Sequence, residues 1–198
     1  MSVALPSHPA PVAAEPSYID WGGVLRPVFG GALQKLRRLG DRFALAVELP
    51  PLDNVELGMA WISALIAARR EGAIMNWPLA GFRPGVTGFP VVFGAGNAGS
   101  QLPITGLAPG YPVRPGQFFS IIHGGRRYLH EAEAAVTANG NGSVILPIAP
   151  MLRISPSDGA VCEFAMPKIE GLLDGDRQSW TLDVALNVGL SFTIMEAR

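Results

Sequence analysis

Glycine and proline interrupt this chain so often that long regular elements have little room. The sequence of 198 residues contains 24 Gly and 18 Pro, about a fifth of the total. Glycine weakens helices and strands through its conformational freedom, and proline removes a backbone donor and fixes one dihedral angle. This density excludes a helical bundle and favours short strands joined by tight turns.

Charged side chains are scarce. They make up 16% of the sequence, against about 25% in a typical soluble domain. The formal net charge of -1 gives no overall field that would attract nucleic acid or an anionic membrane, so we expect neither as a partner. A sparsely charged surface suggests instead that partners cover much of it.

No segment has the features of a membrane span or a secretory signal. The longest mostly apolar stretch, residues 57–68, is shorter than the roughly 20 residues needed to cross a bilayer. Residues 1–16 contain no Lys or Arg and no continuous apolar run. We therefore expect a protein that starts out in the cytoplasm.

The N-terminal half predicts an arm followed by paired strands. Residues 1–17 are rich in Pro and Ala without periodicity, which predicts an extended arm that orders only against a partner. Residues 44–49 predict a strand. Residues 33–39 are its expected antiparallel partner, across a turn at Gly40 and Asp41.

One helix is predicted over residues 54–70. Asp53 and Glu56 form a capping-box arrangement at its start, and Arg69 and Arg70 suit the negative end of the helix dipole. The body of this helix is apolar on nearly every face. Either the fold or a neighbouring subunit must therefore cover it on several sides.

The rest of the chain predicts strands. Alternation and turn residues place them at 117–122 and 127–130 around Gly124-Gly125, at 144–148 and 161–166, and in two C-terminal runs (Trp180, Leu182, Val184, Leu186; then Leu190, Phe192, Ile194). The predicted fold is mainly β, with a β-sandwich that carries one helix and an inserted small β-barrel-like domain. The sandwich takes residues 18–84 and 169–198, and the inserted domain takes residues 85–168.

A glycine-rich run resembles a dinucleotide-binding motif, but its surroundings do not fit. Residues 94–99 match G-x-G-x-x-G. That motif needs a helix starting at the glycines and an acid about 20 residues further on. Prolines follow instead, and no Asp or Glu lies between Glu71 and Glu131. We expect a glycine-rich loop and no cofactor.

The histidines offer a weak metal pattern. His123 and His130 flank a predicted turn, and Glu131 or Glu133 could supply a third ligand, whereas His8 lies in the arm. There is no HExxH, no close His pair and no Cys to complete a set. A structural hairpin is favoured over a metal site, and a small hydrolase that uses His123 or His130 is the remaining catalytic alternative.

No nucleophile is set up for catalysis. Cys162 lies among apolar residues, which is typical of a small buried hydrophobe, and no G-x-S-x-G occurs. The acid pairs Asp174/Asp176 and Glu131/Glu133 are typical of solvated loops. We predict no catalytic, cofactor-binding or metal site, and a protein that is not an enzyme.

Three arginine pairs lie in separate segments, at residues 37–38, 69–70 and 126–127. They are too dispersed for a nucleic-acid-binding stripe. They suit either ion pairs between subunits or solvated faces.

Three segments carry a resemblance to known proteins. They are GALQKLRRLGDRFALAVELPPL, then RPGQFFSIIHGGRRYLHEAEAAVTANGNGSVILPIAPMLR, and finally DGDRQSWTLDVALNVGLSFTIMEAR. The clearest residues in them are 116–119, 128–130, the Gly-Asn-Gly at 140–142, and 150–153. In this order the segments resemble the tail-tip proteins of tailed bacteriophages and prophages, in particular the distal-tail (baseplate hub-ring) group. The Pro/Ala-rich arm has no place in that pattern.

The resemblance implies a virion structural protein of the phage tail tip. It implies a homomeric ring, usually a homohexamer, that joins the tail tube to the baseplate hub and is assembled in the host cytoplasm. The expected partners are further copies of the chain, a tail-tube protein and a baseplate hub protein. The alternative function is a carbohydrate-binding β-module for host-surface adhesion, with the aromatic faces of Phe118, Phe119 and Tyr128 stacked on sugar rings.

Overall fold

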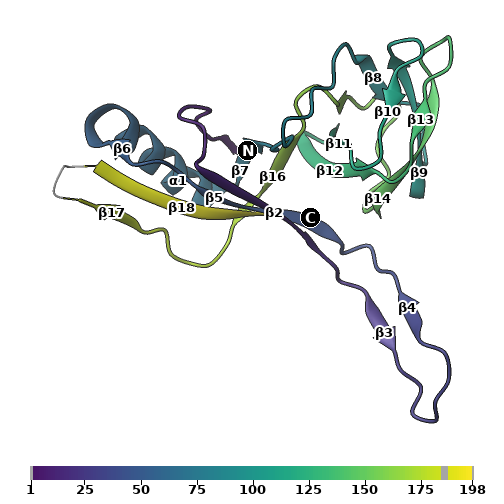
Figure 1. The fold of residues 1–198 in the computed structure, drawn as a ribbon, viewed down its shortest axis with the longest axis horizontal. Coiled ribbons are helices and arrows are strands. Elements are labelled where there is room, and N and C mark those ends of the chain that lie inside the picture. Colours follow the sequence, from purple (N-terminus) through teal and green to yellow (C-terminus); the bar gives the residue numbers. More distant parts are fainter. Residues whose placement is uncertain (1, 184–186, 198) are drawn as a thin grey trace.

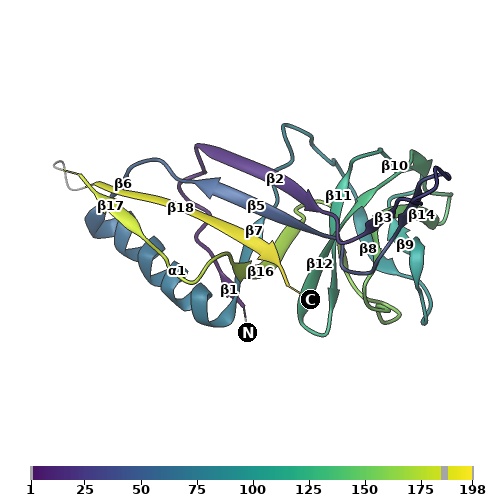
Figure 2. The ribbon, with the colours of Figure 1, turned by 90° about the horizontal axis from the view of Figure 1, so that it is seen from below.

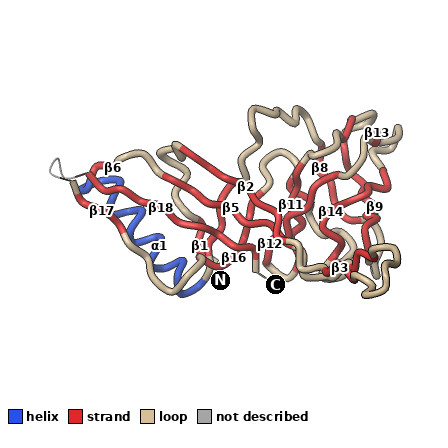
Figure 3. The backbone as a smooth tube through the Cα atoms, turned by 60° about the horizontal axis from the view of Figure 1, so that its bottom comes forward, coloured by secondary structure: helices blue, strands red, loops and turns tan. Residues whose placement is uncertain are grey.

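The computed structural model describes residues 2–183 and 187–197. Strands account for 47% of the structure and helical residues for 8%, which confirms the predicted mainly β class. One sheet carries the helix, and a second sheet curls into a nearly closed barrel. The two parts lie side by side along the long axis of the molecule, with the helix at one end and the barrel at the other (Figure 3).

The first sheet gathers strands from both ends of the chain. Its central path runs in the order β1-β7-β16-β18-β5-β2, and β17 and β6 also pair with β18. The strands are β1 (Val3–Ala4), β2 (Ala13–Ile19), β5 (Arg42–Glu48), β6 (Leu52–Asp53), β7 (Ala73–Asn76), β16 (Lys168–Leu173), β17 (Trp180–Leu182) and β18 (Asn187–Glu196).

The helix differs from its prediction at its first turn. Residues Asn54–Gly58 form one wide π turn, and the α-helix α1 then runs over Met59–Glu71. The turn packs closely on β18, because a Cβ at Gly58 would lie 2.8 Å from Val188 Cγ2. The expected cap is present, since the amide of Glu56 donates to Asp53 Oδ1 at 3.2 Å.

Only one side of α1 is covered. Helix α1 lies against one face of the first sheet (Figure 2), and Trp61, Leu65 and Ala68 are buried in the core there. On the outer side Met59 is 62% exposed and Ile66 is 47% exposed. The fold therefore leaves apolar helix surface open, as the all-round apolar sequence of the helix suggested. No helix in the described part of the chain is long and apolar enough to cross a membrane.

The predicted pairing of residues 33–39 with 44–49 is wrong. Strand β5 pairs with β2 from the N-terminal segment, and β4 (Gln34–Leu36) pairs with β3 (Gly23–Leu25). Asp41 causes the difference, because its carboxylate accepts hydrogen bonds from Trp21 N and Tyr18 Oη, both at 2.8 Å. The chain therefore does not reverse at Gly40 and continues one long hairpin.

The N-terminal segment is not a free arm. Strand β1 lies within residues 1–17, and β2 starts there. Strand β1 pairs with β7 and β2 pairs with β5, both of the same chain. Leu5 is buried in the core of the first sheet. Because β2 is an edge strand, it tolerates Pro16, which cannot donate a ladder hydrogen bond.

The second sheet is built only from residues within 88–163. Its order is β15-β11-β12-β14-β9-β8, and a bridge between Val91 and Val161 brings its two edges together. The turn at Gly124-Gly125 has positive φ at both glycines, as the predicted hairpin requires. The strands are β8 (Gly88–Val92), β9 (Gly99–Leu107), β11 (Phe118–His123), β12 (Arg126–Ala132), β14 (Val144–Leu152) and β15 (Cys162–Glu163), with a small pair β10 (Pro112–Val113) and β13 (Val136–Thr137) beside them.

Both predicted C-terminal strands are present, and they pair with each other. Strand β17 is antiparallel to β18, and Leu190, Phe192 and Ile194 are buried in the core. Trp180 and Leu182 are exposed, however, so β17 does not bury a face. Val184 and Leu186 lie outside the described residues.

Candidate functional site

The glycine-rich run at residues 94–99 forms a loop between β8 and β9. The amide of Gly94 donates to Asp158 Oδ1 at 2.7 Å, and Asn97 Nδ2 donates to the carbonyl of Gly94 at 2.8 Å. Strand β9 follows directly at Gly99, so no helix N-terminus is available for a pyrophosphate. Hydrogen bonds with the side chains of Asp158 and Asn97 thus hold this loop in place.

The histidines do not form a site. In the β11–β12 hairpin His130 lies opposite Phe119, whereas His123 lies opposite Arg126. The two imidazoles are therefore separated by roughly 13 Å of ladder, at about 3.3 Å per residue. His8 is remote from both, and its carbonyl accepts a hydrogen bond from Trp61 Nε1. Among the described residues no group of three His, Cys, Asp or Glu side chains is placed to hold a metal ion.

His130 is a neutral structural residue. Its Nδ1 lies 2.9 Å from the carbonyl of Pro150. The pKa of His130 is lowered to about 3, mainly by burial. The nearby charge of Arg153 also lowers this pKa, whereas the hydrogen bond to Pro150 raises it. A group so buried cannot exchange protons with a substrate in solution.

Cys162 is a buried thiol, as the sequence predicts. It is 2% exposed, and burial raises its pKa to about 12. The thiolate is the reactive form of cysteine, so this side chain is not a nucleophile in the folded protein.

Thiol labelling checks this assignment. A thiol reagent such as DTNB should modify Cys162 only when the protein opens, so labelling in buffer should be at least about a hundredfold slower than in denaturant. A surface cysteine placed by Ser157→Cys is the matched control and should react at once. Rapid labelling of the wild-type protein would contradict the burial of Cys162.

Two of the three aromatic residues proposed for sugar stacking, Phe119 and Tyr128, lie inside the protein. Phe119 stacks on Phe164 with ring centroids 4.5 Å apart. Phe118 packs against Phe43 and Trp77 at the junction of the two parts. Tyr128 is buried beside the guanidinium of Arg153, 5.5 Å from the ring centre. Phe119 and Tyr128 therefore offer no open face, whereas Phe118 is half-buried.

Buried charges join the barrel to the first sheet. Glu163 accepts hydrogen bonds from Ser120 Oγ at 2.7 Å, Arg127 Nε at 3.0 Å and Lys168 Nζ at 3.1 Å. Burial alone would raise the pKa of Glu163, but these bonds outweigh it and hold the pKa below its ordinary value. Glu170 accepts from Ser2 Oγ at 2.7 Å and from the amide of Arg127 at 3.0 Å. Each carboxylate is matched by donors, which is typical of a structural junction.

Glu196 holds the two parts together at a second point. It is completely buried, and its carboxylate accepts from the amide of Leu129 at 2.8 Å and from that of Phe43 at 3.2 Å. It also forms an ion pair with Arg153. Burial raises the pKa of Glu196, and Arg153 and the two amides oppose that rise. The charged pair thus depends on both sheets for its partners.

The arginine pairs have different roles. Arg127 is used in the junction described above. Arg69 donates to the carbonyls of Leu173, Asp174, Gly175 and Arg177, at 2.6 to 3.1 Å, and so fastens α1 to the segment after β16. Arg37 and Arg38 are exposed.

A projecting ribbon is the most exposed part of the molecule. Residues 22–39, here called the hairpin arm, contain β3 and β4 and project away from the first sheet (Figure 1). Phe29 is 100% exposed and Val28 is 92% exposed. The arm carries seven exposed large apolar side chains: Val24, Leu25, Val28, Phe29, Leu33, Leu36 and Leu39.

The hairpin arm is also basic. It contains Arg26, Lys35, Arg37 and Arg38 and no Asp or Glu. Lys35 forms an ion pair with Asp20 at the base of the arm. Within the described part of the chain the three arginines have no ion-pair partner.

Contacts at its base fix the direction of the arm. Asp41 holds Trp21 and Tyr18 by the two hydrogen bonds described above. The guanidinium of Arg42 lies 4.9 Å from the centre of the Trp21 ring. These contacts make the arm a continuation of the β2–β5 ladder with a defined orientation.

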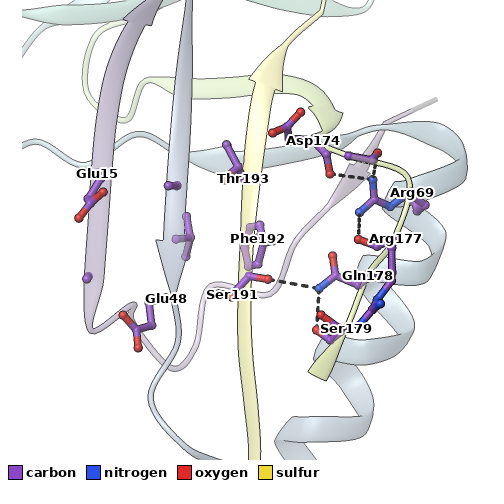
Figure 4. A pocket seen from close by; sticks show the side chains of 14 residues that line it. Glu15, Glu48, Arg69, Asp174, Arg177, Gln178, Ser179, Ser191, Phe192 and Thr193 are labelled. Atoms are coloured by element: carbon purple, nitrogen blue, oxygen red, sulfur yellow. Dashed lines mark hydrogen bonds between the residues drawn. The ribbon is translucent and has the colours of Figure 1, made fainter. Parts of the chain in front are cut away.

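A groove lies at the other end of the same ladder. It has a volume of about 400 Å³ and runs over β2, β5 and β18 toward the segment that Arg69 fastens (Figure 4). Its floor is made of small side chains. Glu15 and Glu48 lie on neighbouring strands at one side of it. The lining residues include Ala13, Glu15, Ala46, Glu48, Arg69, Asp174, Arg177, Gln178, Ser191 and Thr193.

Two carboxylates of this groove form no ion pair with any described residue. Glu15 lies opposite Ala46, two residues from Glu48, so the two glutamates are diagonal neighbours on one face. Arg69 lines the groove, but its hydrogen bonds go to backbone carbonyls.

Comparison with known proteins adds no relative: no protein-family model matches the chain, and no similar curated protein is found.

Proposed function

We propose that this chain is a virion structural protein of a phage tail tip, which assembles as a homomeric ring, expected to be a hexamer, and joins the tail tube to the baseplate hub. The hairpin arm is the observation that carries this proposal. A two-stranded ribbon alone in water is marginally stable at best, and seven exposed apolar side chains on it would be a liability in a monomer. We therefore expect a neighbouring molecule to cover the apolar side chains of the arm.

The position of the open surfaces favours a ring over a two-fold dimer. The arm and the groove lie at opposite ends of one ladder, so a contact between them is head to tail. Head-to-tail contacts between identical chains close into rings when the rotation allows it. The open outer face of α1 adds apolar surface available to the tube or hub protein.

The buried groups fit a structural role. His130, Cys162 and the junction carboxylates are enclosed and matched within the fold. Such groups stabilise a subunit and do not meet a substrate. We therefore propose that the chain acts through its assembly with other proteins and catalyses no reaction.

Immunogold labelling tests the proposed location. Antibodies raised against the purified chain should label one end of the tails in phage particles that carry this gene, at the end distant from the head. Labelling along the whole tube, or none on intact and detergent-opened tails, would contradict the proposal. A major tube protein labelled in parallel is the control for antibody access.

A further inference from the structure

We propose that the hairpin arm of one copy docks in the Glu15–Glu48 groove of the next copy, with its arginines against the two glutamates. This inference rests on the proposed ring and names the contact that would build it. The occupant of the groove is thus a second copy of this chain.

Charge complementarity supports this pairing. Among the described residues, three arginines of the arm form no ion pair with a carboxylate, and the two glutamates of the groove form none with a cation. Asp174, Arg69 and Arg177 line the opposite side of the groove (Figure 4). The β2–β5 side therefore carries only negative charge, from the two glutamates. Like charges on diagonal positions of a sheet repel each other, and cations from a neighbour relieve that repulsion.

Shape also fits. The floor of the groove is formed by Ala13, Ala46, Ser191 and Thr193, which leave room for larger side chains. The arm offers branched and aromatic side chains such as Leu25 and Phe29. In addition, β2 pairs with β5 alone among the described strands, so its outer edge can accept a further strand.

The arm cannot fill its own groove. It leaves the ladder after Ile19 and returns at Arg42, whereas Glu48 lies at the far end of β5. Figure 1 shows the arm pointing away from the sheet. The contact must therefore form between copies.

A second open apolar cluster fits the arm less well. It lies where the barrel closes and comprises Val86, Phe89, Phe93, Val161 and Met166. The nearby carboxylate of Glu163 is already matched by Arg127 and Lys168, and that of Asp158 accepts from Gly94. This cluster has no free negative charge to match the arginines.

A charge-swap experiment tests the contact. The arm variant Arg26→Glu/Arg38→Glu and the groove variant Glu15→Arg/Glu48→Arg each place like charges together, so each should raise the concentration at half-dissociation of the ring by roughly tenfold or more. The chain with all four substitutions restores opposite charges and should recover most of the wild-type assembly. Sedimentation velocity over a range of concentrations measures this, and circular dichroism checks that each variant folds.

The control is Arg83→Glu, an exposed arginine outside both surfaces, which should leave assembly unchanged. A wild-type ring that both swap variants leave intact would overturn the docking inference while the ring stands. Loss of assembly without recovery in the four-fold variant, or equal loss in the control, would also overturn it. A wild-type monomer that binds duplex DNA through Arg26 and Arg38 would assign the arm to nucleic acid, and would contradict both the docking and the ring.

Discussion

Replacing Glu196 by glutamine is expected to lower the free energy of unfolding by about 3 to 5 kcal/mol. The substitution leaves Arg153 buried without its counter-charge, and two guanidinium nitrogens of Arg153 already lack a hydrogen-bond partner. Both oxygens of Glu196 accept hydrogen bonds, so the amide nitrogen of glutamine would point at a donor. The amide of either Leu129 or Phe43 therefore loses its bond, and Arg153 loses its counter-charge, so the junction itself is weakened.

Urea denaturation followed by tryptophan fluorescence measures this loss. The matched control is Glu133→Gln, which neutralises an exposed carboxylate of the barrel and should change the free energy of unfolding by less than about 0.5 kcal/mol. If the Glu196 variant lost no more than this control, the pair with Arg153 would not hold the two sheets together.

Acid is expected to destabilise the protein through His130. Its pKa is about 3 in the folded state, against an ordinary value of 6.5, so the folded state keeps this imidazole neutral. The unfolded chain takes up the proton as the pH falls below 6.5, so stability present at neutral pH is lost between about pH 6.5 and 3. The slope is about 1.4 kcal/mol per pH unit, or about 5 kcal/mol over that whole range.

The variant His130→Gln isolates this effect, because it removes the titrating ring but can still donate to Pro150. Between pH 7 and pH 4 the wild-type protein should lose about 3 kcal/mol more than this variant, measured by urea denaturation at both pH values. His123→Gln removes an imidazole from the same hairpin and should keep the wild-type dependence. Equal pH dependence of the wild type and the His130 variant would show that another group is responsible.

Local chemistry explains which elements were predictable. The Gly124-Gly125 hairpin follows from turn residues that need positive φ, and the start of the helix follows from Asp53 and Glu56. Both signals act within a few residues of the chain. The buried state of Cys162 also follows from its neighbours in sequence.

The strand pairings that failed depend on distant residues. Two antiparallel arrangements of residues 33–49 satisfy the same pattern. Contacts with residues 18–21, such as the hydrogen bonds of Asp41 to Tyr18 and Trp21, favour the longer hairpin. Strand β2 reads as an arm because alanine and proline have low strand propensity. In the structure, pairing with β5 stabilises β2 in spite of this low strand propensity.

The candidate surfaces were missed for a related reason. Glu15 and Glu48 become neighbours only through the β2–β5 pairing that the sequence did not predict. One signal for the arm was present in the sequence, because residues 22–39 combine two Gly-Gly pairs, many apolar residues and no acid. The alternation of β11 and β12 places Phe119 and Tyr128 inside the protein, and sugar binding stays a prediction.

Native mass spectrometry of the purified wild-type chain tests whether the chain forms a ring. We expect a closed homomeric assembly, at six copies, with no series of open intermediates. A closed ring satisfies every arm and groove, so partial assemblies should be sparse. A folded monomer at every concentration tested, or a two-fold dimer, would contradict the proposed ring.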